Sequence, residues 1–178
     1  MDISWAAERT EDFRRHLSDL QDQSYEGAKD RLDRERVFEA ATRLLEPVVN
    51  DVLRQFGSLM LAGSGSIEDS GVVRSEDGSV ERRWSLSWPG QIAAQRRVGE
   101  PGPILPIVIR AFFPPGWTHG HLAGSAVGSW PLQIVNTDDA ARQTATVWAI
   151  AEAEFHQRIY EMVQAWDRVP EPVGAEPR

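Results

Sequence analysis

The sequence contains no cysteine among its 178 residues. This absence excludes disulfides, zinc sites built on thiolates, iron–sulfur clusters and every mechanism that uses a cysteine nucleophile. Lysine is almost absent as well, because Lys29 is the only one in the chain and all other cationic side chains are arginines. We interpret this imbalance as a bias toward GC-rich codons, and selection for arginine in ion pairs is the alternative.

Two further absences bear on where the chain acts. No apolar run approaches the length of about 18 residues that a membrane-spanning helix needs. Charged residues follow Met1 at once, without the apolar segment of a signal peptide. We therefore expect a cytoplasmic protein with no membrane partner. The net charge of -8 also argues against a nucleic-acid partner, whose phosphates require a basic surface.

What the chain does contain is typical of a globular domain. Hydrophobic residues make up 41% of the sequence and charged residues 26%. A chain of this length forms one core more readily than two. We expect a single domain over residues 1–169, followed by a disordered, proline-rich tail over 170–178.

Helical spacing of apolar residues predicts two helices near the N-terminus. Those of the first are Ala6, Phe13, Leu17 and Leu20. The second pattern runs from Val37 to Phe56, and Gly57 stands where a C-terminal cap belongs. Pro47 lies inside this pattern, so a kink or break is expected near Glu46.

Strand patterns occupy the glycine-rich middle of the chain, residues 58–136. Alternation is clearest over residues 80–88, and residues 104–113 are rich in β-branched side chains. Pro106 should lie at the start or edge of that strand. We also expect a short strand at 59–61 and one more within 122–135. Together these segments predict an antiparallel sheet of about four to five strands.

A long C-terminal helix is expected after a cap at Asn136 or Thr137. Its apolar stripe consists of Trp148, Ala151, Phe155, Ile159, Met162 and Trp166. Glu154 and Arg158 are interpreted as an ion pair on its solvated side. Helices at both ends of the chain with consecutive strands between them favour the α+β class, with the helices packed on the antiparallel sheet.

The most unusual segment contains His119 and His121. In a strand, residues two apart point to the same face, so both imidazoles could bind one divalent metal. A catalytic metal usually requires a third protein ligand, for which His156, Glu152 and Asp138 are candidates. The alternative is that both histidines are polar loop residues beside a turn.

Three more residues are candidates for a ligand pocket near these histidines. Trp117 and Trp130 flank the segment and could supply aromatic walls. Arg110 interrupts an apolar strand, and a covered guanidinium there needs a carboxylate or an anionic ligand. A structural ion pair or simple exposure to solvent would equally explain Arg110.

Two functional hypotheses remain open. In the first, the chain is a non-enzymatic binding or assembly module, with a protein partner or as a homo-oligomer. In the second, it is a small enzyme with a pocket around His119 and His121, where the histidines bind a metal that activates water or one of them acts as general base. Arg110 would then orient an anionic substrate.

Overall fold

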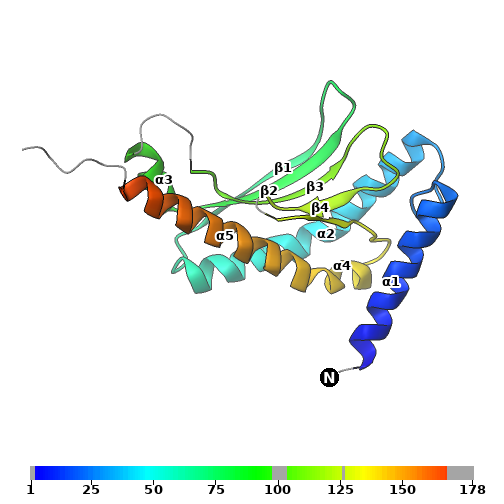
Figure 1. The fold of residues 1–178 in the computed structure, drawn as a ribbon, viewed down its shortest axis with the longest axis horizontal. Coiled ribbons are helices and arrows are strands. Elements are labelled where there is room, and N and C mark those ends of the chain that lie inside the picture. Colours follow the sequence, from blue (N-terminus) through cyan, green and yellow to red (C-terminus); the bar gives the residue numbers. More distant parts are fainter. Residues whose placement is uncertain (1–2, 98–103, 126, 168–178) are drawn as a thin grey trace, which may run out of the picture.

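The computed structural model describes residues 3–97, 104–125 and 127–167, with side chains described for 10–93, 104–125 and 127–163. It confirms the α+β class, with one antiparallel sheet whose strands follow chain order (Figure 1). The strands are β1 Ser66–Arg74, β2 Val80–Ser87, β3 Ile107–Phe113, β4 His121–Ala123 and β5 Ser129–Pro131. The helices are α1 Ile3–Asp22, α2 Arg31–Met60, α3 Pro89–Arg97, α4 Thr137–Arg142 and α5 Thr144–Asp167. The predicted tail at 170–178 lies outside the described residues.

The second N-terminal helix, α2, is longer than its apolar pattern and continues through Pro47. It begins after Asp30, whose carboxylate accepts a hydrogen bond from the amide of Asp33 at 2.9 Å. The prediction of a break near Glu46 is wrong. Pro47 is exposed, so water can reach the carbonyl that loses its amide partner, while the buried side of the helix keeps its packing.

The end of α2 also lies later than predicted. Gly57 is buried inside the helix, and the amide of Leu61 donates to its carbonyl at 3.0 Å. The chain leaves the helix through Ala62 and Gly63, which have φ angles of 49° and 73°. The expected strand at 59–61 is therefore wrong, because these residues complete the last turn of α2.

The alternation over 80–88 is confirmed in β2. Val80, Arg82, Trp84, Leu86 and Trp88 are all buried. Arg82 is buried on this face because it reaches two carboxylates, Asp69 at 2.5 Å and Glu46 at 2.7 Å. The alternate residues, including the exposed Arg83, point to the other face of the sheet.

Strand β3 begins directly after Pro106, as expected for a residue that cannot donate to the sheet. The one strand predicted within 122–135 is instead the two short strands β4 and β5. Residues 132–135 lie outside both, although Leu132 and Ile134 are buried. Their burial explains why this apolar run resembled a strand.

The C-terminal helical region confirms its cap and corrects its continuity. The Asn136 side chain accepts a hydrogen bond from the amide of Asp139 at 2.8 Å. The predicted single helix is divided at Gln143 into α4 and α5. The buried face of α5 is also rotated from the predicted stripe. Its fully or nearly fully buried residues are Val147, Ile150, Ala151, Glu154 and Arg158.

Helices α2 and α5 pack against one face of the sheet, and the main apolar core lies between these layers (Figure 1). Trp84 on β2, Phe56 on α2 and Ile150 on α5 belong to it. Helix α1 stands at the end of the sheet near α4 (Figure 1). Among the described helices, none combines the length and apolar character that a membrane span requires.

Candidate functional site

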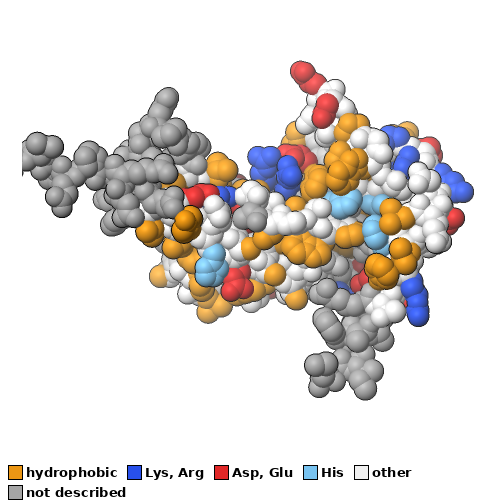
Figure 2. Space-filling model, viewed as in Figure 1, with side chains coloured by type: hydrophobic (Ala, Val, Ile, Leu, Met, Phe, Trp, Pro, Cys, Tyr) orange, Lys and Arg blue, Asp and Glu red, His pale blue; other side chains and the backbone are white. Residues whose placement is uncertain are grey.

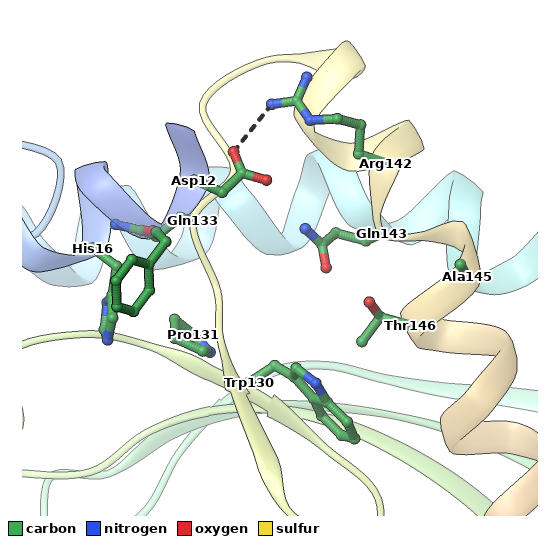
Figure 3. Close-up of a pocket in the computed structure, with 10 residues that line it drawn as sticks. Asp12, His16, Trp130, Pro131, Gln133, Arg142, Gln143, Ala145 and Thr146 are labelled. Carbon is green, nitrogen blue, oxygen red and sulfur yellow. Dashed lines mark hydrogen bonds and ion pairs between the residues drawn. The ribbon is translucent and has the colours of Figure 1, made fainter. Parts of the chain in front are cut away.

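A pocket of about 430 Å³ lies between α1, β5 and the junction of α4 with α5 (Figure 3). This volume is within the range of roughly 300–1,000 Å³ that is usual for small-molecule sites. The lining residues are Asp12, Phe13, His16, Trp130, Pro131, Gln133, Arg142, Gln143, Ala145 and Thr146. They come from three separate parts of the chain, so only the tertiary fold assembles this pocket.

Local geometry explains the first two walls. Asp12 and His16 are four residues apart on α1, so they share one side of that helix with Phe13. Trp130 on β5 lies opposite Leu122 on β4, which is buried on the helix-covered face of the sheet. The indole of Trp130 therefore points to the same side of the sheet as α1 and α5.

The third wall depends on the interruption at Gln143. Its amide donates to the carbonyl of Ala140 at 3.0 Å, and its carbonyl accepts from the amide of Val147 at 2.8 Å. The backbone of Gln143 therefore forms hydrogen bonds with residues of both α4 and α5. Its side chain projects with Thr146 toward the space between His16 and Trp130 (Figure 3). Both groups can form hydrogen bonds with a molecule in the pocket.

Polar contacts hold α1 at the edge of the pocket. Arg15 binds Glu26 at 2.7 Å and Asp139 at 3.3 Å, while Arg142 binds Asp12 at 3.4 Å (Figure 3). Arg142 also contacts the Asp139 carboxylate. Because Asp12 and Arg142 neutralise each other, the rim of the pocket carries no net charge.

The apolar stripe of α1 is not covered by a sheet face, contrary to expectation. The exposed fractions of Phe13, Leu17 and Leu20 are 61%, 40% and 42%. These residues follow a spacing of four and three, so they form a continuous apolar strip on one side of the helix. Ala6 lies among the residues whose side chains are not described.

A pair of histidines packs behind the α1 wall. The ring centroids of His16 and His119 are 4.8 Å apart, and His119 also contacts the Tyr25 ring at 5.7 Å. His119 is only 2% exposed. Among the described residues, neither His16 Nδ1 nor His119 Nε2 has a hydrogen-bond partner. The nearest counter-charge is Asp19, whose Oδ2 lies 3.9 Å from His119 Nε2.

This environment keeps both imidazoles neutral near pH 7. Burial lowers the pKa of His16. Burial, with the neighbouring His16, lowers the pKa of His119 to about 4. Burial alone would raise the pKa of Asp19, but hydrogen bonds from the amides of Glu26 and Gly27 and from other groups hold it below its usual range. The pocket side of this cluster is therefore uncharged apart from the Asp12–Arg142 pair.

His121 does not join His119 in one ring cluster. Its ring contacts Trp117 at 4.7 Å and Phe112 at 5.8 Å. Among the residues that the structure describes, no three His, Asp or Glu side chains gather closely enough to hold a metal ion. Within that part of the chain, His119 and His121 are therefore not joined by a third potential ligand.

Of the three predicted pocket residues, Trp117 and Arg110 both contact the Phe112 ring, and Trp130 lies elsewhere. Trp130 lines the pocket at α1, whereas Trp117 is 44% exposed and packs on His121 and Phe112. Arg110 lies on the opposite face of the sheet, beside a second groove. Sequence reasoning missed Asp12, His16, Arg142 and Gln143, because no local pattern shows that α1 meets β5.

Comparisons of this chain with protein-family models, with curated proteins and with solved structures find no match.

Proposed function

We propose that this chain is a non-enzymatic binding module that holds a small, uncharged, partly aromatic molecule in the pocket between α1 and β5. One observation carries the proposal: the pocket joins aromatic walls to convergent neutral polar groups. Phe13 and Trp130 offer flat apolar surfaces, and Gln143 and Thr146 offer a donor and acceptors. This combination is characteristic of sites that orient a small ligand.

The charge of the ligand follows from the charges already paired in the protein. Arg142 is engaged by two carboxylates, and Asp12 by Arg142. A charged ligand would have to compete with these ion pairs, whereas a neutral amide or hydroxyl group would not. We therefore expect neutral aromatic amides to bind more tightly than the matching carboxylates or amines.

A pocket-filling substitution tests the proposal. Ala145→Trp places an indole within the lining, so it should abolish the chemical-shift changes that benzamide and nicotinamide cause at pocket residues in ¹⁵N-¹H spectra. Ala149→Trp is the matched control, because Ala149 is exposed on the same helix outside the lining. Equal shifts in both variants, or no shifts in the unmodified protein, would contradict the proposal.

Assembly of the chain into a homo-oligomer is a second candidate. The exposed strip of Phe13, Leu17 and Leu20 favours it, because amphipathic helices are usually stabilised by packing of their apolar side. Replacing Leu17 by glutamate is expected to shift a dimer to monomer in sedimentation velocity without unfolding it. A wild-type protein that stays monomeric at about 100 μM would rule out this candidate.

The positions of the histidines support the enzymatic alternative less well than they support a binding module. It places a catalytic pocket around His119 and His121, but His16 is the histidine that lines the pocket. His119 lies behind it, and His121 packs in another ring cluster. A general base here would have to be His16, whose lowered pKa leaves a neutral imidazole available near pH 7.

A further inference from the structure

Helix α1 forms one wall of the pocket but takes no part in the main apolar core. Among the described side chains, the core contains none from α1. The helix stands at one end of the sheet (Figure 1), and Figure 2 shows hydrophobic side chains at the molecular surface along it. Because packing of an apolar face supplies most of the stability of a helix in a protein, α1 is held in place by other contacts.

The C-terminal end of α1 is anchored to the rest of the fold. The buried carboxylate of Asp19 accepts a hydrogen bond from the amide of Glu26 at 2.9 Å and from the side chain of Gln133 at 3.2 Å. Tyr25, which follows the helix, is fully buried, and its hydroxyl donates to the carbonyl of Leu132. These contacts fix the point where α1 ends.

The pocket end of α1 is attached less firmly. The side chains of Asp12 and Arg142 are 3.4 Å apart, and each is 33% exposed. The partly exposed Arg15 lies 3.3 Å from Asp139. Ion pairs that water reaches contribute little to stability, because solvent screens them and two long side chains must be ordered. The ion pairs that join this end of α1 to α4 are therefore weak.

The inner side of α1 rests on a second imidazole ring. The ring centroids of His16 and His119 are 4.8 Å apart. In the described part of the chain, neither His16 Nδ1 nor His119 Nε2 has a hydrogen-bond partner. An outward tilt of α1 lets water reach both nitrogens, which offsets part of the cost of separating the two rings.

The turn after α1 has the backbone geometry expected of a hinge. Gln23 and Glu26 have φ angles of 53° and 48°, in the left-handed region that residues other than glycine rarely adopt. Hinges are commonly a few residues at the end of an element that absorb changes in φ and ψ. With a rise of about 1.5 Å per residue, Asp12 lies about 10 Å along α1 from Asp19. A small tilt about the anchored end therefore displaces the pocket wall.

We propose that α1 is a lid and that a ligand in the pocket holds this lid closed. The proposal rests on the function proposed above, because the ligand is the small uncharged molecule of that pocket. Bound there, it contacts Phe13 and His16 on the lid and Trp130 and Gln143 on the rest of the protein. The ligand therefore favours the closed position, which is that of the present structure, over one in which α1 has tilted away.

Distances between two spin labels test this motion, because a protein without cysteine can be labelled at two introduced ones. Glu11→Cys places one label on α1 and Arg54→Cys the other on α2, both at exposed positions. Saturating benzamide should narrow their distance distribution roughly twofold and centre it on the distance in this structure. The control pair, Arg54→Cys with Glu152→Cys on α5, should show no change. A distribution that is equally narrow without benzamide would overturn the lid.

Arg15→Gln tests the same motion in the unlabelled protein. Arg15 lies outside the pocket lining, yet it joins α1 to Asp139. Its replacement should lower the fraction of closed molecules and weaken the Kd for benzamide about threefold, measured by titration in ¹⁵N-¹H spectra. Arg14→Gln is the matched control and should leave the Kd unchanged, because the exposed Arg14 pairs with Glu11 of its own helix. An unchanged Kd in Arg15→Gln would contradict the lid.

The spectra separate failure of the lid from failure of the proposed function. If benzamide shifts the signals of pocket residues without changing the label distances, the pocket has a fixed wall, so the lid fails and the binding module stands. No shift of the pocket residues would contradict both. The label measurement keeps Arg15, so it decides the question even where Arg15→Gln does not fold.

Discussion

Replacing Glu154 by glutamine is expected to lower the free energy of unfolding by roughly 3 kcal/mol, because it leaves a buried guanidinium without its buried counter-charge. Glu154 is fully buried and Arg158 is 4% exposed, and they pair at 3.0 Å. Both also contact the Ser125 hydroxyl, which links α5 to the segment between β4 and β5. Urea denaturation followed by circular dichroism measures the change.

The matched control for this prediction is Glu161→Gln. Glu161 binds the same Arg158 at 3.0 Å but is 34% exposed, so its loss should cost less than about 1 kcal/mol. Replacing the whole pair with Glu154→Met and Arg158→Leu should recover most of the stability lost by Glu154→Gln. A single variant as stable as wild type would show that this pair does not hold α5 to the sheet.

Acidification from pH 7 to pH 5 should destabilise the protein, with about 2 kcal/mol arising from His119 alone. The pKa of His119 is about 4 in the folded protein and 6.5 in an ordinary environment. The unfolded chain therefore takes up a proton as the pH falls through 6.5, while folded His119 does not. Stability is lost across this window, and the lowered pKa values of His16 and His121 act in the same direction.

A pair of substitutions isolates this contribution. His119→Phe keeps a ring of similar shape among Tyr25 and His16 but cannot be protonated, so it should remove about 2 kcal/mol of the pH dependence between pH 7 and pH 5. His156→Phe replaces an exposed histidine on α5 and should leave the dependence unchanged. An unaltered pH profile in His119→Phe would contradict burial of a neutral imidazole under α1.

Sequence patterns predicted the elements whose fold depends on local periodicity. The alternation in β2 gave the buried face, Pro106 marked the start of β3, and Asn136 capped α4. These predictions succeeded because each signal is local. The alternation of side chains along a strand, the amide donor that proline lacks and the side-chain oxygen of a helix cap all act within a few residues.

Tertiary packing decided the elements that the sequence did not reveal. Pro47 predicts a kink or a break near Glu46, yet packing of the buried helix face keeps α2 continuous, without the break. Glu154 and Arg158 were assigned to solvent, since an i,i+4 pair has the same pattern on an exposed and a buried face. Their burial depends on contacts with Ser125 and the carbonyl of Pro106, which are distant in sequence.

The candidate site was only partly predictable for the same reason. Trp130 and the histidine segment were singled out by their residue types, and Trp130 does line the pocket. The residues opposite Trp130 come from two distant parts of the chain. Those of α1 lie far earlier in the sequence, and those of the α4–α5 junction lie more than ten positions later. No motif in those helices distinguishes His16 or Gln143 from an ordinary surface residue.

The central claim is that the pocket between α1 and β5 binds a small uncharged aromatic molecule. Crystals of the protein soaked with benzamide and with benzoate test it most directly. We expect density for benzamide against Trp130, with its amide within hydrogen-bond distance of Gln143 or Thr146, and none for benzoate at that position. An empty pocket in both soaks, or equal occupancy by the carboxylate, would contradict the claim.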